Sequence, residues 1–220
     1  MTTFDISFFP RKLSKIDELH LPDHHHLNSQ DHCYYLGEYT ARAGYSHSPT
    51  NNLIINFKKP MNRRGGRQWV YKLKAIRKAA EVMSFALKDT DFESVSFVPI
   101  PPSKRKTDPE YDDRVAQTLR LAFGTRSDII DALTIAESRE AYHNDTNRCP
   151  SALTDNLVVD LDELGKAKRT IVLFDDVITT GCHFRAMKDE ILSIAPDKTI
   201  YGVFLARRVP NSADFSSFFE

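Results

Sequence analysis

The sequence predicts an α/β protein with a mostly parallel central sheet flanked by helices and a small irregular N-terminal lobe. Short apolar runs alternate along the chain with segments whose apolar residues recur every three or four positions. Strands that alternate with helices form parallel sheets, and such sheets bind ligands outside the carboxyl ends of their strands. The 220 residues, 41% of them hydrophobic, are enough for one sizeable core. We therefore expect a lobe or hood over residues 1–50 and an α/β domain over residues 51–220.

Composition limits the partners and the compartment. Lys plus Arg and Asp plus Glu each total 30, so the net charge is zero and no global attraction to nucleic acid or membrane is implied. Cys33, Cys149 and Cys182 form no CxxC pair, and an odd count without a signal peptide argues against a secreted disulfide scaffold. No run of about 18 apolar residues occurs. We expect a cytoplasmic protein with no membrane partner.

Histidines crowd the N-terminal lobe in the stretch HLPDHHHLNSQDHC. A zinc site is one interpretation. Adjacent histidines point in divergent directions, however, and paired ligands at short intervals are missing, so a polar surface loop is favoured. The residues concerned are His20, His24, His25, His26, His32 and Cys33.

A helix is predicted over residues 67–88, and a basic loop precedes it. One face carries the apolar stripe Trp69, Leu73, Ile76, Ala80, Met83 and Leu87. We expect the opposite face, with Lys72, Lys74, Arg77 and Lys78, to be solvated. The preceding loop, KKPMNRRGGR, is predicted to be mobile and could contact a polyanion through Lys58, Lys59, Arg63, Arg64 and Arg67.

The next predicted strand, residues 95–100, ends at a run of prolines and leads into a cationic loop. This loop contains Ser103, Lys104, Arg105 and Lys106. Residues 107–109, Thr-Asp-Pro, are typical of a helix start. Cations beside the backbone amides of a helix N-terminus favour phosphate or pyrophosphate binding. An ordinary basic turn is the alternative.

The second half of the chain continues the alternation. A helix with Val115, Leu119 and Ala122 ends at Gly124, and residues 128–138 form the next expected strand. Residues 139–155 lose all periodicity and are predicted to form a long exposed loop, typical of a lid. Three more strands, over 156–161, 171–174 and 199–206, and a helix with the stripe Phe184, Met187, Ile191 and Ile194 complete the pattern.

The stretch TIVLFDDVITTGCHF, residues 170–184, carries the strongest functional signal. Asp175 and Asp176 follow a predicted buried strand at its carboxyl end, where we expect both to point into the ligand crevice. Adjacent carboxylates need Mg²⁺ or hydroxyl donors to meet them. The next residues, Thr179, Thr180, Gly181, Cys182 and His183, form a tight turn into a helix, typical of a phosphate cradle. The stretch therefore fits a ligand with both a polyol and a phosphomonoester.

This stretch resembles the phosphoribosyl pyrophosphate (PRPP) binding motif of type I phosphoribosyltransferases: an apolar strand, two acids and a Thr-Thr-Gly loop. The resemblance implies that Asp175 and Asp176 contact the ribose hydroxyls and Mg²⁺, and that residues 179–183 bind the 5-phosphate. His183 departs from the small residue usual in the family. By order along the chain, Ser103, Lys104 and Arg105 match the pyrophosphate loop. Residues 139–155, with His143 and Arg148, match the catalytic loop.

Within the superfamily, LIINFKK, VPIPPSK, DDVITTG and FLARR most resemble ComF-like proteins, loosely from residue 51 to residue 208. A cysteine zinc knuckle and an arginine-glycine signature of that branch are missing, with YDDR at 111–114 instead. A homodimer is expected by analogy alone. A base could stack on Tyr34, Tyr35, Tyr39 or Phe215, although aromatic residues more often belong to the core.

The implied activity is Mg²⁺-dependent displacement of pyrophosphate from C1 of PRPP by a nitrogen base of nucleotide metabolism. Asp175, Asp176, Arg148 and His143 would be the catalytic residues. The alternative is a non-catalytic protein that senses PRPP or a nucleotide alongside DNA-processing partners, which the basic loop favours. A third interpretation, a phosphohydrolase with Mg²⁺ on the two acids, lacks an obvious nucleophile.

Overall fold

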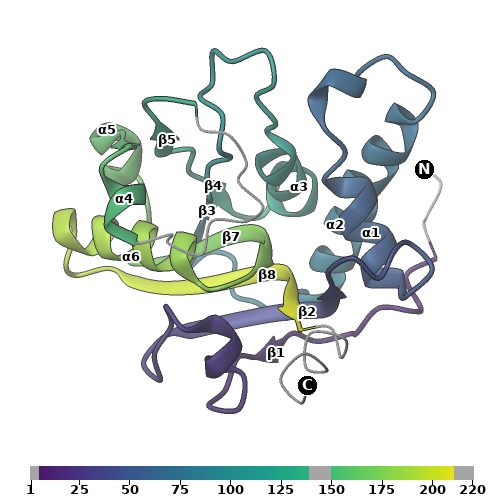
Figure 1. Ribbon diagram of the computed structural model, residues 1–220. Coiled ribbons are helices and arrows are strands. Elements are labelled where there is room, and N and C mark those ends of the chain that lie inside the picture. The colour runs from purple at the N-terminus through teal and green to yellow at the C-terminus, as the bar shows by residue number, and fades with distance from the viewer. Residues whose placement is uncertain (1–4, 139–149, 211–220) are drawn as a thin grey trace, which may run out of the picture.

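A six-stranded, mostly parallel sheet organises the protein (Figure 1). The computed structural model describes residues 5–138 and 150–210. The strand order is β1-β2-β8-β7-β3-β4, and β1 alone runs antiparallel to its neighbour. The predicted α/β class with helices flanking the sheet is confirmed. The strands are β1 Ser14–Lys15, β2 His32–Thr40, β3 Val95–Pro99, β4 Asp128–Ile129, β7 Thr170–Ile178 and β8 Thr199–Val209.

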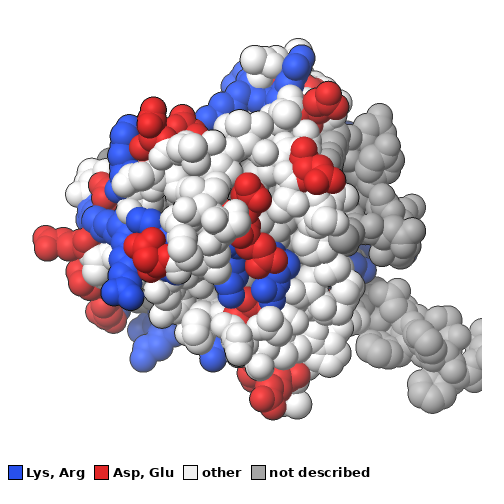
Figure 2. All heavy atoms as spheres, turned by 90° about the vertical axis from the view of Figure 1, so that its left-hand side faces the viewer, with Lys and Arg blue, Asp and Glu red and all other residues white. Residues whose placement is uncertain are grey.

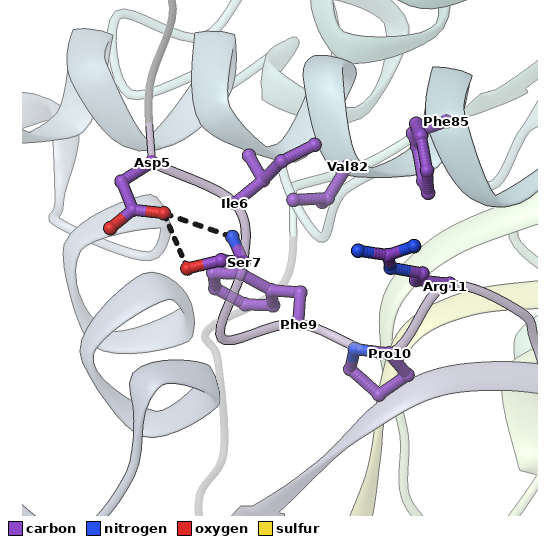
Figure 3. Close-up of a pocket in the computed structure, with 8 residues that line it drawn as sticks. All are labelled: Asp5, Ile6, Ser7, Phe9, Pro10, Arg11, Val82 and Phe85. Carbon is purple, nitrogen blue, oxygen red and sulfur yellow. Dashed lines mark hydrogen bonds between the residues drawn. The ribbon is translucent and has the colours of Figure 1, made fainter.

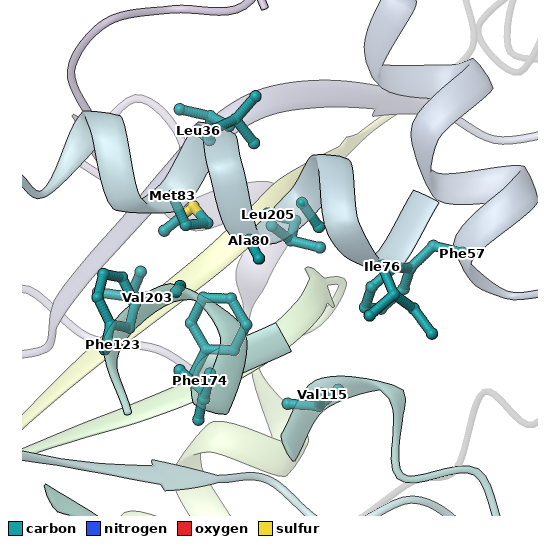
Figure 4. Packing of buried hydrophobic residues seen from close by; sticks show 14 of the residues in the cluster. Leu36, Phe57, Ile76, Ala80, Met83, Val115, Phe123, Phe174, Val203 and Leu205 are labelled. Atoms are coloured by element: carbon teal, nitrogen blue, oxygen red, sulfur yellow. The ribbon is translucent and has the colours of Figure 1, made fainter. Parts of the chain in front are cut away.

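Helices cover both faces of the sheet because neighbouring strand residues point to opposite sides. Phe97 and Phe174 pack with α1, α2 and α3, whereas Val98 and Leu173 pack with α5 and α6. Figure 4 shows the core on the side of α1, α2 and α3, with Phe123 and Phe174 among its residues. In this core the ring centroids of Phe97 and Phe123 lie 4.6 Å apart in a stacked arrangement. The helices are η1 Leu21–His24, α1 Pro49–Phe57, η2 Met61–Arg63, α2 Trp69–Ala86, α3 Arg114–Phe123, α4 Pro150–Thr154, α5 Leu161–Gly165 and α6 Cys182–Ile194.

Helix α1 illustrates how local sequence positions a later site residue. Ser48 accepts a hydrogen bond from the Asn51 N–H at 3.0 Å, and Pro49 occupies the first turn, so the helix has a defined start. It ends at Phe57. Lys58 is the C-cap residue of this helix, and its N–H donates to the Ile54 carbonyl at 2.9 Å.

The N-terminal segment is less irregular than expected. Strand β2 pairs with β8 from His32↔Tyr201 to Thr40↔Val209, so this part of residues 1–50 belongs to the central sheet. Buried Cys33, Tyr35 and Leu36 supply its apolar residues. The apolar run is short and is flanked by histidines and polar residues, so the sequence shows no clear strand pattern here.

Three local expectations are wrong. Helix α3 begins at Arg114, well after the expected start at 107–109. Leu73 is 41% exposed whereas Lys72 is 1% exposed. The face of α2 that packs against the core includes the small residues Ala75 and Ala79 and differs from the predicted face. The single strand expected over 128–138 is two strands, β4 and β5 Leu133–Ile135, which belong to different sheets.

Strand β5 pairs antiparallel with β6, Leu157–Val159, in a separate two-stranded sheet. The strand predicted over 156–161 therefore exists but does not join the central sheet. Across residues 5–138 and 150–210, no helix has the length and apolar character needed to cross a membrane.

Candidate functional site

The site is built on β7, which lies between β3 and β8 in the sheet. The expected end of this strand at Phe174 is wrong, since pairing continues through Asp175↔Phe204 to Ile178↔Arg207. A short loop then leads into α6. Gly181 has φ of 84°, a left-handed conformation that glycine adopts without steric cost. The loop therefore turns sharply into the N-terminus of a helix.

A small pocket brings Asp175 together with the predicted phosphate loop. Its volume is about 30 Å³, close to the share of one water molecule in the liquid. A phosphate group would therefore not fit entirely within the pocket as it stands. The lining residues are Asp175, Val177, Ile178, Thr179, Thr180, Gly181, Cys182, His183, Phe184 and Phe204.

Asp176 does not line this pocket, contrary to the expectation that both carboxylates enter one crevice. Successive residues of a strand face opposite sides of the sheet. On its own side, Asp176 is 3% exposed and accepts hydrogen bonds from Lys58 Nζ at 3.0 Å and Arg114 Nη2 at 2.7 Å. The two adjacent acids thus have different environments.

Asp176 belongs to a buried charge network that joins three helices to β7. Arg114 also donates to Asp112 at 2.6 Å, and Lys72 donates to the same carboxylate at 2.6 Å. Lys72 makes two further bonds to the carbonyls of Phe57 and Lys59. Sequence reasoning missed this network. Its signal is the YDDR segment, which places one carboxylate and one guanidinium two residues apart.

The environments move the two pKa values in opposite directions. Burial, and then the charge of Asp176, raise the pKa of Asp175 to about 7. Burial also acts to raise the pKa of Asp176, but Lys58 and Arg114 outweigh it and hold that pKa well below its usual range. Asp176 is therefore ionised at neutral pH, whereas Asp175 titrates near neutrality.

The Asp175→Asn variant should change how stability depends on pH. Between its ordinary pKa of 3.8 and about 7, folded Asp175 keeps a proton that the unfolded chain releases. The stability of the intact protein therefore falls as pH rises through this window. The variant does not lose stability in this way. The difference in free energy of unfolding, variant minus intact protein, should therefore increase by more than about 1 kcal/mol between about pH 4 and about pH 8.

Urea unfolding at both pH values measures this difference, with exposed Asp197→Asn as the control. Parallel pH profiles for Asp175→Asn and the intact protein would show that Asp175 has an ordinary pKa.

The predicted pyrophosphate loop follows β3, at the same sheet edge as Asp175. The Ile100 N–H donates to the Phe174 carbonyl at 2.9 Å, which fixes the start of this loop beside β7. Farther along, Lys104 lies 3.9 Å from Glu110, and the Arg105 N–H donates to Ser138 at 3.2 Å. None of Ser103, Lys104 and Arg105 lines the pocket.

The loop also lacks the helix N-terminus expected at 107–109, because α3 begins at Arg114. A helix N-terminus therefore contributes no attraction for an anion at this loop. His143 and Arg148, and Cys149 beside them, lie outside the described residues.

Several cations of the basic loop predicted to contact a polyanion already make contacts within the protein. In the basic loop, Lys58 binds Asp176, Lys59 Nζ lies 3.3 Å from the Tyr45 hydroxyl, and Arg63 binds Gln68. On the face shown in Figure 2, positive and negative side chains are intermixed. Within 5–138 and 150–210, no three His, Cys, Asp or Glu side chains are grouped to hold a metal ion.

A larger cavity of about 330 Å³ lies elsewhere, between residues 5–11 and α2 (Figure 3). Phe9 and Val82 from its lining belong to the core on the α2 side of the sheet. Phe184 and Phe204 at the Asp175 pocket belong to the opposite core. The larger cavity contains no residue that the sequence predicts for the site.

Comparisons with known proteins identify no family for this chain. No protein-family model matches the chain. A search of curated proteins found no match. The pocket and the sequence motif that forms it therefore carry the functional signal of the chain.

Proposed function

We propose that this protein binds PRPP through Asp175 and the loop 179–183, as type I phosphoribosyltransferases do, and transfers the 5-phosphoribosyl group to a nitrogen base. One observation carries the proposal: the acid and the Thr-Thr-Gly loop line one pocket after a central parallel strand. Ligands of open α/β sheets bind at this edge. Helix α6 begins at the loop, so the positive end of the helix dipole favours an anion there.

In this proposal the two acids have separate roles. Asp175 faces the pocket and accepts hydrogen bonds from the ribose hydroxyls. Asp176 holds Lys58 and Arg114 on the other side of the sheet and fixes the strand. The hydroxyls of Thr179 and Thr180 and the loop amides bind the 5-phosphate, and His183 stands where the family has a smaller residue.

The donor set of the pocket fits Mg²⁺ only together with the ligand. Mg²⁺ commonly takes one or two carboxylates, several waters and substrate phosphates, and the pocket supplies one carboxylate, Asp175. When bound, Mg²⁺ would offset the charge of the departing pyrophosphate. Lys104 and Arg105, with His143 and Arg148 of the predicted lid, are the side chains that we assign to that group and to excluding water. Because Asp175 must ionise to act, binding should strengthen as pH rises through about 7.

Binding without transfer is the second candidate function. The positions of Lys104 and Arg105 favour it, since both lie outside the pocket lining and Lys104 is near Glu110. A protein that only senses PRPP or a nucleotide would need the phosphate loop and Asp175 but not those cations.

Pyrophosphate release from PRPP, measured with a panel of purine and pyrimidine bases and Mg²⁺, separates these functions. Release that depends on a particular base would establish the transferase. PRPP binding without release would establish the sensor, and salt-sensitive retention on DNA would add the expected nucleic-acid partner. Release of phosphate from simple esters would instead support the phosphohydrolase.

A further inference from the structure

The histidine-rich segment lies directly against the predicted phosphate loop. His24 is fully buried, and its Nδ1 is hydrogen-bonded to the Thr179 carbonyl. Two residues later, the His26 N–H donates to the Thr180 carbonyl at 2.9 Å. A chain segment about 155 residues away in sequence thus binds two consecutive carbonyls of the loop.

The third loop residue is held by close packing. A Cβ on Gly181 would lie 2.7 Å from Cγ of Leu27, closer than real Cβ atoms approach a neighbour. Leu27 itself is buried. Residues 24–27 therefore contact Thr179, Thr180 and Gly181 in turn.

This segment is anchored to the helix that the loop opens. Asp31, whose side chain is 0% exposed, pairs with Arg185 at 2.6 Å and with Lys188 at 2.7 Å, both on α6. Arg185 also donates to the His26 carbonyl at 3.2 Å. Buried ion pairs therefore hold the segment that contacts the loop against α6.

The contact with Thr179 defines the protonation of His24. A carbonyl only accepts hydrogen bonds, so Nδ1 of His24 carries a proton. Nε2 is buried and has no hydrogen-bond partner among the described residues. Burial lowers the pKa of His24, and nearby Arg207 on β8 and His20 lower it further, while the Thr179 bond and Asp23 oppose this. The ring is therefore neutral at neutral pH.

These contacts also set the direction of the loop amides. In a trans peptide the C=O and the following N–H point in opposite directions, and the described chain has no cis peptide. Because the Thr179 and Thr180 carbonyls point to residues 24–26, the N–H groups of Thr180 and Gly181 point away from that segment. His24 and His26 do not line the pocket, whereas Thr180 and Gly181 do.

We propose that His24 is a positioning residue for the anion site: its Nδ1–H fixes the Thr179–Thr180 peptide so that the loop amides face the bound phosphate. This inference depends on the proposed function, because it assigns a phosphate to the loop. The histidine-rich segment, for which the sequence favours a polar surface loop over a zinc site, would thus pack as the outer wall of the phosphate loop.

Three variants test the role of His24. His24→Leu removes the donor, whereas His24→Asn replaces it with an amide N–H close to the position of Nδ1. His25→Leu is the control, because His25 is exposed and next in sequence. Titration with ribose 5-phosphate should show affinity at least about tenfold weaker for His24→Leu, a loss equal to about 1.4 kcal/mol. Affinity should stay within about threefold of the intact protein for His24→Asn and the control.

A second measurement needs no ligand. Nitrogen NMR of the intact protein should show the Nδ1–H tautomer of His24, and hydrogen exchange at Thr180 and Gly181 should accelerate in His24→Leu alone. If ribose 5-phosphate fails to bind the intact protein, the proposed function and the phosphate role of His24 fall together. If it binds but affinity and exchange are unchanged in His24→Leu, or the Nε2–H tautomer is found, the positioning role alone is overturned.

Discussion

Replacing Lys72 with methionine is expected to lower the free energy of unfolding by about 3–5 kcal/mol, the usual cost of removing one partner of a buried ion pair. Lys72 is 1% exposed, and its ammonium group holds the Asp112 carboxylate and the carbonyls of Phe57 and Lys59. Methionine fills similar volume but donates no hydrogen bond. Two buried carbonyls and part of a carboxylate would lose their partner.

Lys74→Met is the matched control, because Lys74 lies on the same helix and is exposed. Its effect should stay within about 0.5 kcal/mol. Urea unfolding of both variants measures the difference. Equal stability of the two would mean that the network around Asp112 contributes nothing to the fold.

Gly181→Ala should destabilise the protein by about 2–5 kcal/mol, because two penalties add. A left-handed backbone conformation costs a non-glycine residue roughly 1–2 kcal/mol, and overpacking typically costs about 1–3 kcal/mol. Gly181 has φ of 84°, and a Cβ there would meet Leu27 at 2.7 Å. We also expect ribose 5-phosphate affinity to fall, since the loop cannot keep its conformation.

Gly65→Ala separates the two penalties. Gly65 has φ of 80°, but no heavy atom outside residues 64–66 lies within 4 Å of the position of its Cβ. Its loss should be only about 1–2 kcal/mol. A loss at Gly181 no larger than that at Gly65 would show that Leu27 does not pack against the loop.

Local sequence patterns predict much of the central sheet. The apolar runs predicted at residues 95–100 and 171–174 both form strands, although β7 continues beyond its predicted end. Strand β2 is not predicted, because its apolar residues are few and its partner β8 lies about 169 residues away. Pairing over such distances leaves no local signal in a single sequence.

The same limit applies to the site. Asp175 and the loop 179–183 are neighbours in sequence, so one motif predicts their shared pocket. Lys58 and Arg114 meet Asp176 from 118 and 62 residues away, and the motif cannot show that this acid is already paired. The pattern of apolar and charged residues likewise assigns Lys72 to the solvated face, because it cannot show a buried carboxylate partner such as Asp112.

The pairing of Asp176 also decides how the function should be tested. Removing Asp176 would leave Lys58 and Arg114 without this partner and would endanger the fold. Lost binding in such a variant would then have two explanations. Asp175→Asn avoids this problem, because Asp175 faces the pocket and makes no ion pair within the described residues.

Calorimetric titration of PRPP into the intact protein and into Asp175→Asn, each with and without Mg²⁺, tests the central claim most directly. The account predicts Mg²⁺-dependent binding to the intact protein that strengthens from about pH 6 to about pH 8, and at least about tenfold weaker binding to the folded variant, equal to about 1.4 kcal/mol. Absence of PRPP binding by the intact protein, or equal binding by the variant, would contradict the proposal that Asp175 and the loop 179–183 form a PRPP site.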